Sequence, residues 1–366
     1  MQPFTCTSVT GTDPRAVVER CRAQLTGLSE GADFGFVYVT SVMLPHMDEL
    51  LRTLRKVTGV QQWLDCGGIG VCANDREIYD VPAAAIMLAS FAADTWMALS
   101  THDFDQTLDR ATAWEARFPG SLGMVHTDGE AALQDGRLQR LAEELANTFL
   151  VGGLSSGETA GISSRQGISG VLFAPQVTVA VDHTQGCTPI GPRHRISSAE
   201  RNIAITLDDR PALDVLREDI GEVMARDMSR AGNYMFAALS VPGSDTRDYM
   251  VRNLIGIDEQ RGLVAIGDDL RGQSELTFCR RDGASAREDL TRMTDALRER
   301  VGDQPIRGGV YVSCLARGRH QFGDDSEEVR AIQNALGGFP LVGFFANGEI
   351  FNGRVYGYTG VLTLFL

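Results

Sequence analysis

Pro340-Leu-Val-Gly-Phe-Phe-Ala-Asn-Gly-Glu-Ile-Phe-Asn-Gly-Arg-Val-Tyr-Gly-Tyr-Thr-Gly-Val-Leu-Thr-Leu-Phe-Leu366 is the stretch from which the fold can be read. Two apolar residues lead into Gly343, and a Gly348-Glu349 turn follows. The alternating residues from Val355 to Phe365 are typical of a strand. The stretch therefore predicts a strand, a turn and a second strand that together hold one carboxylate.

The same pattern occurs earlier in the chain. Val151-Gly-Gly-Leu-Ser-Ser-Gly-Glu158 repeats it position for position and leads into an apolar run at 168–173. A looser copy at 65–73 carries Cys72-Ala73 where the other two carry Gly-Glu. Each glycine turn follows a predicted strand, helix and strand. Repeats separated by many tens of residues indicate duplicated units rather than a short-period solenoid.

The fold class predicted from this repeated pattern is mixed α/β (α+β). We expect repeated strand–helix–strand–glycine-turn units, with mixed sheets layered with helices in two packed halves. Between the second and third units, short strands near 235–278 and a helix at 284–300 indicate a further antiparallel or mixed sheet. Asp209-Arg210-Pro211 is a helix start and a reasonable joint. The expected domains are therefore residues 1–207 and 208–366.

Composition excludes several classes of function. With 34 basic and 48 acidic residues the formal charge is −14, which disfavours binding to nucleic acid or to an anionic membrane surface. No apolar run approaches the roughly 20 residues of a membrane span, and the first residues lack a signal peptide, so we expect a cytoplasmic protein. Seven cysteines without a Cys-x-x-Cys pair indicate reduced thiols and no structural zinc site.

Cys314-Leu-Ala-Arg-Gly-Arg-His-Gln-Phe322 is the segment with the most chemical content. A strand ends at Cys314, and a loop with Arg317, Gly318 and His320 precedes a helix that begins near 324–326. Loops of this kind commonly bind ligands in layered α/β proteins. Arg317 could hold a ligand carboxylate in bidentate fashion, or it could instead pair with Glu349 or Glu158 to fix the turns. Aromatic residues that could line an apolar pocket are Phe322, Phe344, Phe345 and Tyr358.

Two glycine motifs suggest catalysis or cofactor binding only weakly. Gly68-Ile-Gly-Val-Cys-Ala73 fits the loose dinucleotide pattern, but no helix pattern follows it. Gly153-Leu-Ser155-Ser-Gly157 fits the nucleophile elbow of hydrolases, yet the residues after it do not favour a helix. The corresponding turn at Gly343 has no serine. An architectural role therefore suits both motifs better.

The six histidines show no metal-binding spacing. A haem needs only one axial histidine in an apolar cavity, so His183, His194 and His320 stay open as axial ligands. A surface or hydrogen-bonded histidine is the more common case for each of them.

These segments together resemble the FIST family, as an N-terminal plus a C-terminal FIST domain over roughly residues 30–366. The resemblance lies in Gly152–Phe173, Gln185–Pro192, Leu207–Leu213, Cys314–Gly318 and Gly343–Glu349. It implies a stand-alone bacterial sensory protein that binds small ligands such as amino acids. Some bacterial members are haem proteins that sense nitric oxide. Because the sequence contains no kinase, cyclase, methyl-accepting or F-box segment, signalling is expected to need a separate protein such as a histidine kinase.

Our expectation from the sequence is a cytoplasmic sensor for signal transduction that holds an amino acid or a related metabolite between its two halves, with no catalytic residues. The expected ligand-binding residues are Cys314, Arg317, Gly318, His320, Phe322, Asn347, Glu349 and Glu158, with Cys187 and its loop closing the pocket. One alternative is a haem-based nitric oxide sensor that uses His183, His194 or His320. A second is an enzyme with Cys314 or Ser155 as nucleophile, which would need a base within hydrogen-bond reach.

Overall fold

The structure is a computed structural model that describes residues 4–26, 31–99, 103–128, 136–156, 168–225, 235–241 and 249–366. The fold is mixed α+β, as predicted. The chain forms two compact units, one of Met1–Gln185 with Arg287–Leu366 and one of Gly186–Ala286. The sequence boundary at 207/208 is a different division, because it falls inside the second unit.

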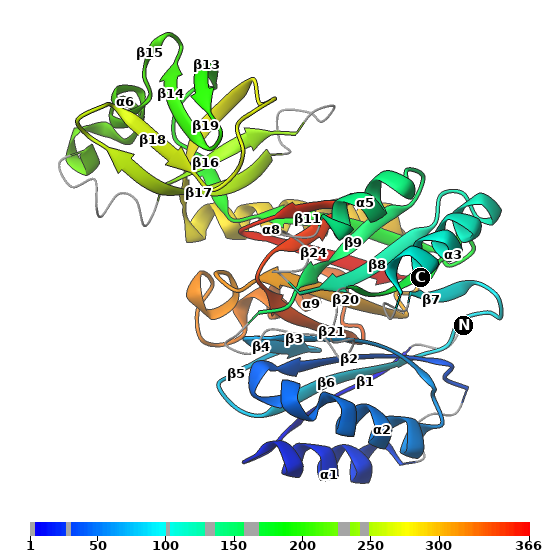
Figure 1. Ribbon diagram of the computed structural model, residues 1–366. Coiled ribbons are helices and arrows are strands. Elements are labelled where there is room, and N and C mark those ends of the chain that lie inside the picture. Colours follow the sequence, from blue (N-terminus) through cyan, green and yellow to red (C-terminus); the bar gives the residue numbers. More distant parts are fainter. Residues whose placement is uncertain are drawn as a thin grey trace. The chain divides into compact units, whose positions relative to one another are not determined.

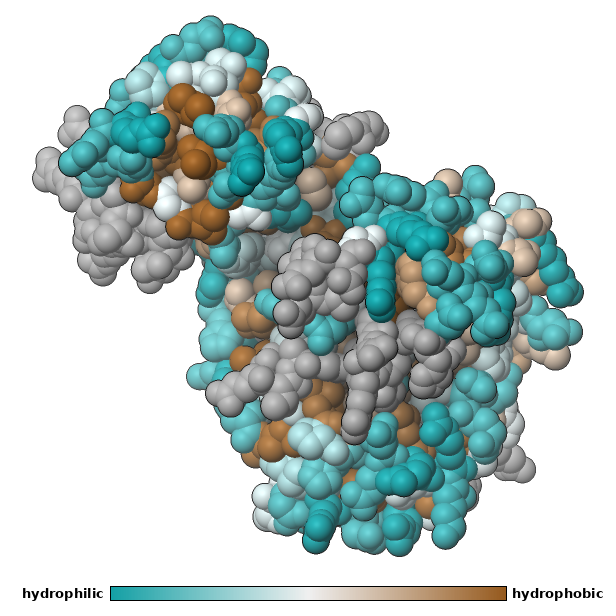
Figure 2. Space-filling view, viewed as in Figure 1, coloured by the Kyte–Doolittle hydropathy of each residue, from teal (hydrophilic) through white to brown (hydrophobic). Residues whose placement is uncertain are grey.

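The first sheet of the first unit shows the repeated order of strands and helices most simply (Figure 1). Its strand order is β1 (Thr5–Thr10), β6 (Ala83–Ala89), β2 (Phe34–Thr40) and β3 (Gln62–Gly68). The strands β2 and β3 are parallel. One face is covered by α1 (Pro14–Leu25), η1 (Ser41–His46) and α2 (Met47–Thr58). Asp13 caps α1, and the outward side chains of both helices form a hydrophilic face (Figure 2).

The other two sheets repeat this order and add a hairpin. The second contains β7 (Trp96–Leu99), β10 (Ile168–Phe173), β8 (Leu122–Thr127) and β9 (Phe149–Leu154), with α3 (Phe104–Arg117) and α5 (Arg137–Glu144) against it. The third contains β11 (Val179–Gln185), β24 (Thr359–Phe365), β20 (Gly308–Cys314) and β21 (Leu341–Ala346). The third repeat also includes α8 (Gly283–Val301), η2 (Gly318–His320) and α9 (Glu327–Leu336).

Two of the three repeats add a hairpin to the sheet of another repeat. The hairpin β4 (Gly70–Ala73) and β5 (Arg76–Tyr79) leaves the first sheet and pairs with β21. The hairpin β22 (Glu349–Phe351) and β23 (Arg354–Tyr356) leaves the third sheet and pairs with β9. The prediction of one continuous strand from Val355 to Phe365 is therefore wrong, since the chain breaks at 357–358 and β23 and β24 belong to different sheets.

The exchanged hairpins also correct the alignment of the repeats. Val71 pairs with Phe344, and Glu349 pairs with Gly153. Each of the two residues lies two positions before the end of its strand. Each strand is followed by a two-residue turn that contains an asparagine at positive φ. Val71, rather than Ala73, therefore stands where the third repeat has Glu349. The expected match of Cys72-Ala73 with Gly-Glu is wrong, because the pairing within the hairpins puts Gly70-Val71 at that place.

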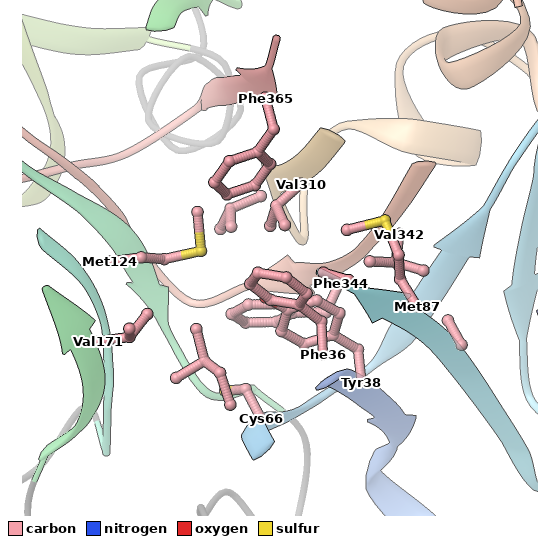
Figure 3. Close-up of a cluster of buried hydrophobic side chains, with 14 of the residues drawn as sticks. Phe36, Tyr38, Cys66, Met87, Met124, Val171, Val310, Val342, Phe344 and Phe365 are labelled. Carbon is pink, nitrogen blue, oxygen red and sulfur yellow. The ribbon is translucent and has the colours of Figure 1, made fainter. Parts of the chain in front are cut away.

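Apolar side chains from all three sheets meet in one core (Figure 3). Tyr38 stacks on Phe344 with ring centroids 5.2 Å apart, and Phe36 lies 5.8 Å from Phe365. Met124 and Val171 reach the same core from the second sheet. The three repeats therefore depend on one another for burial of their inner faces.

The second unit is a separate antiparallel sheet with its own core. Its strand order is β12 (Cys187–Pro189), β19 (Glu275–Arg281), β13 (His194–Glu200), β14 (Ile203–Leu207), β18 (Leu263–Ile266), β17 (Tyr249–Asp258) and β16 (Met235–Ser240). Because β16 also pairs with β19, the sheet closes on itself. The short β15 (Arg210–Pro211) pairs with β14 and leads into α6 (Ala212–Ala225).

Candidate functional site

A buried ion pair stands at the end of β20. The Arg317 amide donates to the Cys314 carbonyl, and the turn directs the Arg317 side chain inward, where it is 0% exposed. Its Nε donates to Glu328 Oε1 at 2.7 Å. Nη2 lies 2.7 Å from the same oxygen, without the angle of a hydrogen bond. Burial lowers the pKa of Arg317, but the charge of Glu328 outweighs burial and raises it.

Glu328, the second residue of α9, is the centre of this network. Besides Arg317, it accepts hydrogen bonds from Tyr311 Oη at 2.7 Å, Ser313 Oγ at 3.2 Å and the Gly318 amide at 2.8 Å. A carboxylate with this many donors is well stabilised even when fully buried. From the sequence, Arg317 could hold a ligand carboxylate or pair with Glu349 or Glu158, and Glu328 was not among the candidate partners.

Gly318 is fixed by its neighbours. Its φ is +50°, and a Cβ atom there would lie 2.1 Å from Tyr79 Oη. Tyr79 belongs to the exchanged hairpin β4–β5, and its ring packs 4.8 Å from that of Phe345. The Arg319 guanidinium lies 4.5 Å above the same Tyr79 ring and pairs with Asp80. The loop after β20 is thus shaped by a hairpin from the other end of the sequence.

Glu77 on the same hairpin brings a further carboxyl group to α9. Its Oε2 accepts from Tyr79 Oη at 2.8 Å, and its Oε1 accepts from the Val329 amide at 3.4 Å. Burial, and after it the charge of Glu328, raises the pKa of Glu77 to about 7. A carboxylate beside the first turn of a helix is favourably placed toward the helix dipole.

Glu349 is buried at the start of β22, with 0% exposure. Its Oε2 accepts from the Thr359 amide at 3.1 Å and from Thr359 Oγ1 at 2.7 Å. Its Oε1 has no hydrogen-bond partner among the described residues. Burial raises the pKa of Glu349 to about 8, although the bonds from Thr359 and the charge of Arg317 oppose this shift.

Cys314 lies within electrostatic range of both Glu349 and Arg317. Its side chain is buried, with 7% exposure. Burial and the charge of Glu349 raise the pKa of its thiol far above the usual value. Because the thiolate is the nucleophile, this environment does not favour thiol chemistry at neutral pH.

The structure brings together some of the expected ligand-binding residues. Arg317 and Gly318 contact Glu328, and the Phe322 ring lies 5.1 Å from the Arg317 guanidinium carbon. The side chains of His320 and Asn347 are exposed. Cys187 belongs to the second unit, where its carbonyl accepts from Tyr249 Oη at 2.6 Å. Glu158 lies outside the described residues.

The turn with the hydrolase-like serine is a structural junction. Ser156 Oγ accepts from the Ile69 amide at 2.9 Å and donates to the Phe345 carbonyl, which links all three repeats. Ser155 is buried, and its amide donates to the Thr127 carbonyl at 3.0 Å. No base lies within hydrogen-bond reach of Ser155 Oγ in the part of the chain that the structure describes. The arrangement gives no support to Ser155 as a nucleophile.

The candidate haem histidines have different surroundings. His194 in the second unit is bonded by both ring nitrogens, Nδ1 to Asp208 at 2.6 Å and Nε2 to Asp219 at 2.9 Å, which leaves neither for iron. The His183 ring packs 4.2 Å from Phe351. Within the described ranges, no group of three or more His, Cys, Asp or Glu side chains is arranged to hold a metal ion.

His126 is a buried histidine that the sequence analysis did not single out. Its Nε2 lies 3.0 Å from Tyr38 Oη, and burial lowers its pKa to about 3. It is therefore a neutral member of the core at physiological pH. Only its place in a largely apolar strand could have indicated burial.

The chain matches the FIST N domain over residues 33–210 and the FIST C domain over residues 212–352. An uncharacterized protein of Mycobacterium tuberculosis is 29% identical over 341 residues, which cover 87% of each chain. An uncharacterized protein of Mycobacterium bovis is 29% identical over 324 residues, which cover 82% of each chain.

Among solved structures, cyanuric acid hydrolase from A. caulinodans aligns with a TM-score of 0.37 and 8% identity, over 100% of this chain and 99% of that chain. No helix in the described ranges is long and apolar enough to cross a membrane. FIST domains are associated with sensing in signal transduction. The two domain matches confirm the resemblance: this chain belongs to the FIST family.

Proposed function

We propose that this protein is a sensor that binds a small zwitterion of the α-amino-acid class at Arg317 and Glu349 in its first unit. One observation carries the proposal. Arg317 Nη1, a donor, and Glu349 Oε1, an acceptor in the ionised form, are both buried and both without a partner among the described residues.

Leaving such groups unsatisfied is costly. Each buried polar group without a hydrogen bond costs about 1–3 kcal/mol, and more if it is charged. Buried polar atoms in native proteins are almost always paired with protein or with another molecule. A site that keeps two of them, one cationic and one acidic, within electrostatic range of each other favours a ligand with the complementary pair of charges.

An α-amino acid has that pair. Its carboxylate suits the planar guanidinium of Arg317, whose orientation is already fixed by the Nε bond to Glu328. Its ammonium group suits Glu349, whose other oxygen is held by Thr359. Neither side chain has to be ordered on binding, so the entropic cost is limited mainly to the ligand.

Calorimetry on the full chain with each of the twenty proteinogenic L-amino acids tests the proposal. The key variant is Glu349→Gln, which keeps the shape and removes the charge. Loss of a charge-assisted hydrogen bond should weaken binding roughly 10- to 100-fold, from about 1.5–3 kcal/mol. The matched control is Glu299→Gln on the exposed face of α8, which should leave the affinity unchanged.

Ligand analogues separate the two contacts. For a ligand that binds, the carboxylic acid without the amino group should bind wild type and Glu349→Gln equally. The amine without the carboxylate should remain sensitive to Glu349→Gln. If no amino acid binds, or if Glu349→Gln and Glu299→Gln behave alike, the proposed site is wrong.

A further inference from the structure

The buried site contains more acidic than basic groups. The buried carboxyl groups of Glu328 and Glu349 both interact with the Arg317 guanidinium, and the half-buried carboxyl group of Glu77 interacts with Glu328. If Glu328 and Glu349 were both ionised, the charge of Arg317 would compensate only one of these two buried carboxylates. Burial of an uncompensated charge is costly enough that such groups usually become neutral instead.

Arg317 neutralises Glu328 in preference to Glu349. Its Nε is bonded to Glu328, whose carboxylate also accepts from two hydroxyl groups and an amide. Within the part of the chain that the structure describes, Glu349 accepts only from the neutral donors of Thr359, and both bonds go to the same oxygen. In the absence of a ligand, Glu349 is therefore the carboxyl group with the weakest support for a negative charge.

Among the described residues, the groups that surround Glu349 include no cation in contact with it. From β20 comes Cys314, a neutral thiol, and from β24 comes Thr359. Its strand neighbours are Gly153 on β9 and Tyr356 on β23. Glu328 opposes its ionisation at longer range, and Arg317 favours it.

We propose that Glu349 is a carboxylic acid before the ligand binds and a carboxylate afterwards, so that binding of an amino acid releases one proton. This inference rests on the proposed function. The O–H bond of Glu349 breaks, its proton passes to water or buffer, and the ligand ammonium group keeps all its protons and becomes the counter-ion. The pKa of about 8 given to Glu349 by burial agrees with this assignment.

The coupling would make the sensor respond to pH. Binding needs ionised Glu349, so affinity should rise about tenfold per pH unit below the pKa of Glu349 and level off above it. At still higher pH the ligand amino group loses its own proton and affinity falls again. A metabolite signal would therefore be read more strongly in a more alkaline solution.

A first experiment needs no ligand. Infrared difference spectra between wild type and Glu349→Gln, recorded below and above about pH 8, should show a protonated carboxyl band. The band should be present in wild type at the lower pH, lost at the higher pH and absent from the variant. If wild type lacks the band at the lower pH, the inference is overturned. Because Gln mimics the protonated acid, the variant should fold as well as wild type at the lower pH.

A second experiment counts protons. Calorimetry at about pH 7 with the amino acid of the panel that binds most tightly, in phosphate and in Tris, should give about one proton released per ligand. Glu349→Gln should release none. Binding without proton release overturns this inference and leaves the proposed function standing. If no amino acid binds, the proposed function and the release step both fail, and the infrared band still decides whether Glu349 was protonated.

Discussion

Replacement of Glu328 by glutamine should destabilise the first unit strongly. The change removes the counter-charge of Arg317, which is 0% exposed. Breaking a buried ion pair by removal of one partner costs about 3–5 kcal/mol, because the remaining charge is uncompensated. The glutamine would also replace one carboxylate oxygen by an NH2 group, which would face either Tyr311 and Arg317 or Ser313 and Gly318, all of which now donate to the carboxylate.

The neighbouring residue supplies the control. Glu327 lies one position earlier on α9 and pairs with Arg287, but both side chains are 49% exposed. An exposed pair of this kind is worth about 0–1 kcal/mol, so Glu327→Gln should change stability by no more than that. The two variants make the same chemical change on the same turn of one helix and differ in burial.

Denaturant unfolding followed by tryptophan fluorescence is the assay. Trp63, Trp96 and Trp114 are the three tryptophans of the chain, and all belong to the first unit, so the signal reports on that unit alone. The double variant Arg317→Met with Glu328→Gln removes the stranded charge and should recover part of the loss. Equal stability of Glu328→Gln and Glu327→Gln would refute the reasoning.

Three further outcomes are expected. The Glu349→Gln variant should become more stable than wild type as pH rises from about 4.5 through 8, by up to the order of 5 kcal/mol. The reason is that the pKa of Glu349 is raised in the folded state, so wild type loses stability as this acid ionises. Denaturation at several pH values checks this. In the second unit, burial lowers the pKa of His194, but its bonds to two aspartates outweigh burial and raise the pKa. The stability that His194 contributes is therefore complete below pH 6.5 and lost as pH rises through the folded-state pKa. Hydrogen exchange in Gly186–Ala286 should increase over that range in wild type and much less in His194→Gln. Gly343→Ala should destabilise the first unit by about 3 kcal/mol or more, since its Cβ would lie 1.7 Å from the Tyr311 carbonyl oxygen, whereas Gly256→Ala, with 3.6 Å to its nearest neighbour, should be tolerated in a thermal unfolding comparison.

Local elements were predictable because their signals are local. Asp13 and Pro14 at the start of α1 act through the first turn of their own helix, and the structure shows that cap. The apolar run of β2 and the apolar face of α2 likewise need only near neighbours in sequence. The resemblance to the FIST family was predictable for a different reason, since it rests on the order of several short motifs.

The exchange of hairpins was not predictable from periodicity. A hairpin has the same alternation and the same turn residues whether it joins its own sheet or another one, so nothing in 70–79 or 349–356 states which edge it pairs with. Glu328 was missed for a related reason. An acidic residue in the first turn of a helix usually reads as a dipole or solubility feature, and only the fold brings Arg317 and Tyr311 to it.

The hairpin exchange has a consequence for the site itself. The loop with Arg317 and Gly318 is shaped by Tyr79, and α9 is met by Glu77, both about two-thirds of the chain away in sequence. Glu349 sits on the other exchanged hairpin, paired with β9 of the second repeat. The first repeat has Val71 in the place of Glu349, so the acid–guanidinium pair belongs to the third repeat. Arg317 and Glu349 are nevertheless brought near each other only where all three repeats are folded together. A change that loosens either hairpin should therefore alter the proposed ligand binding without replacing Arg317 or Glu349.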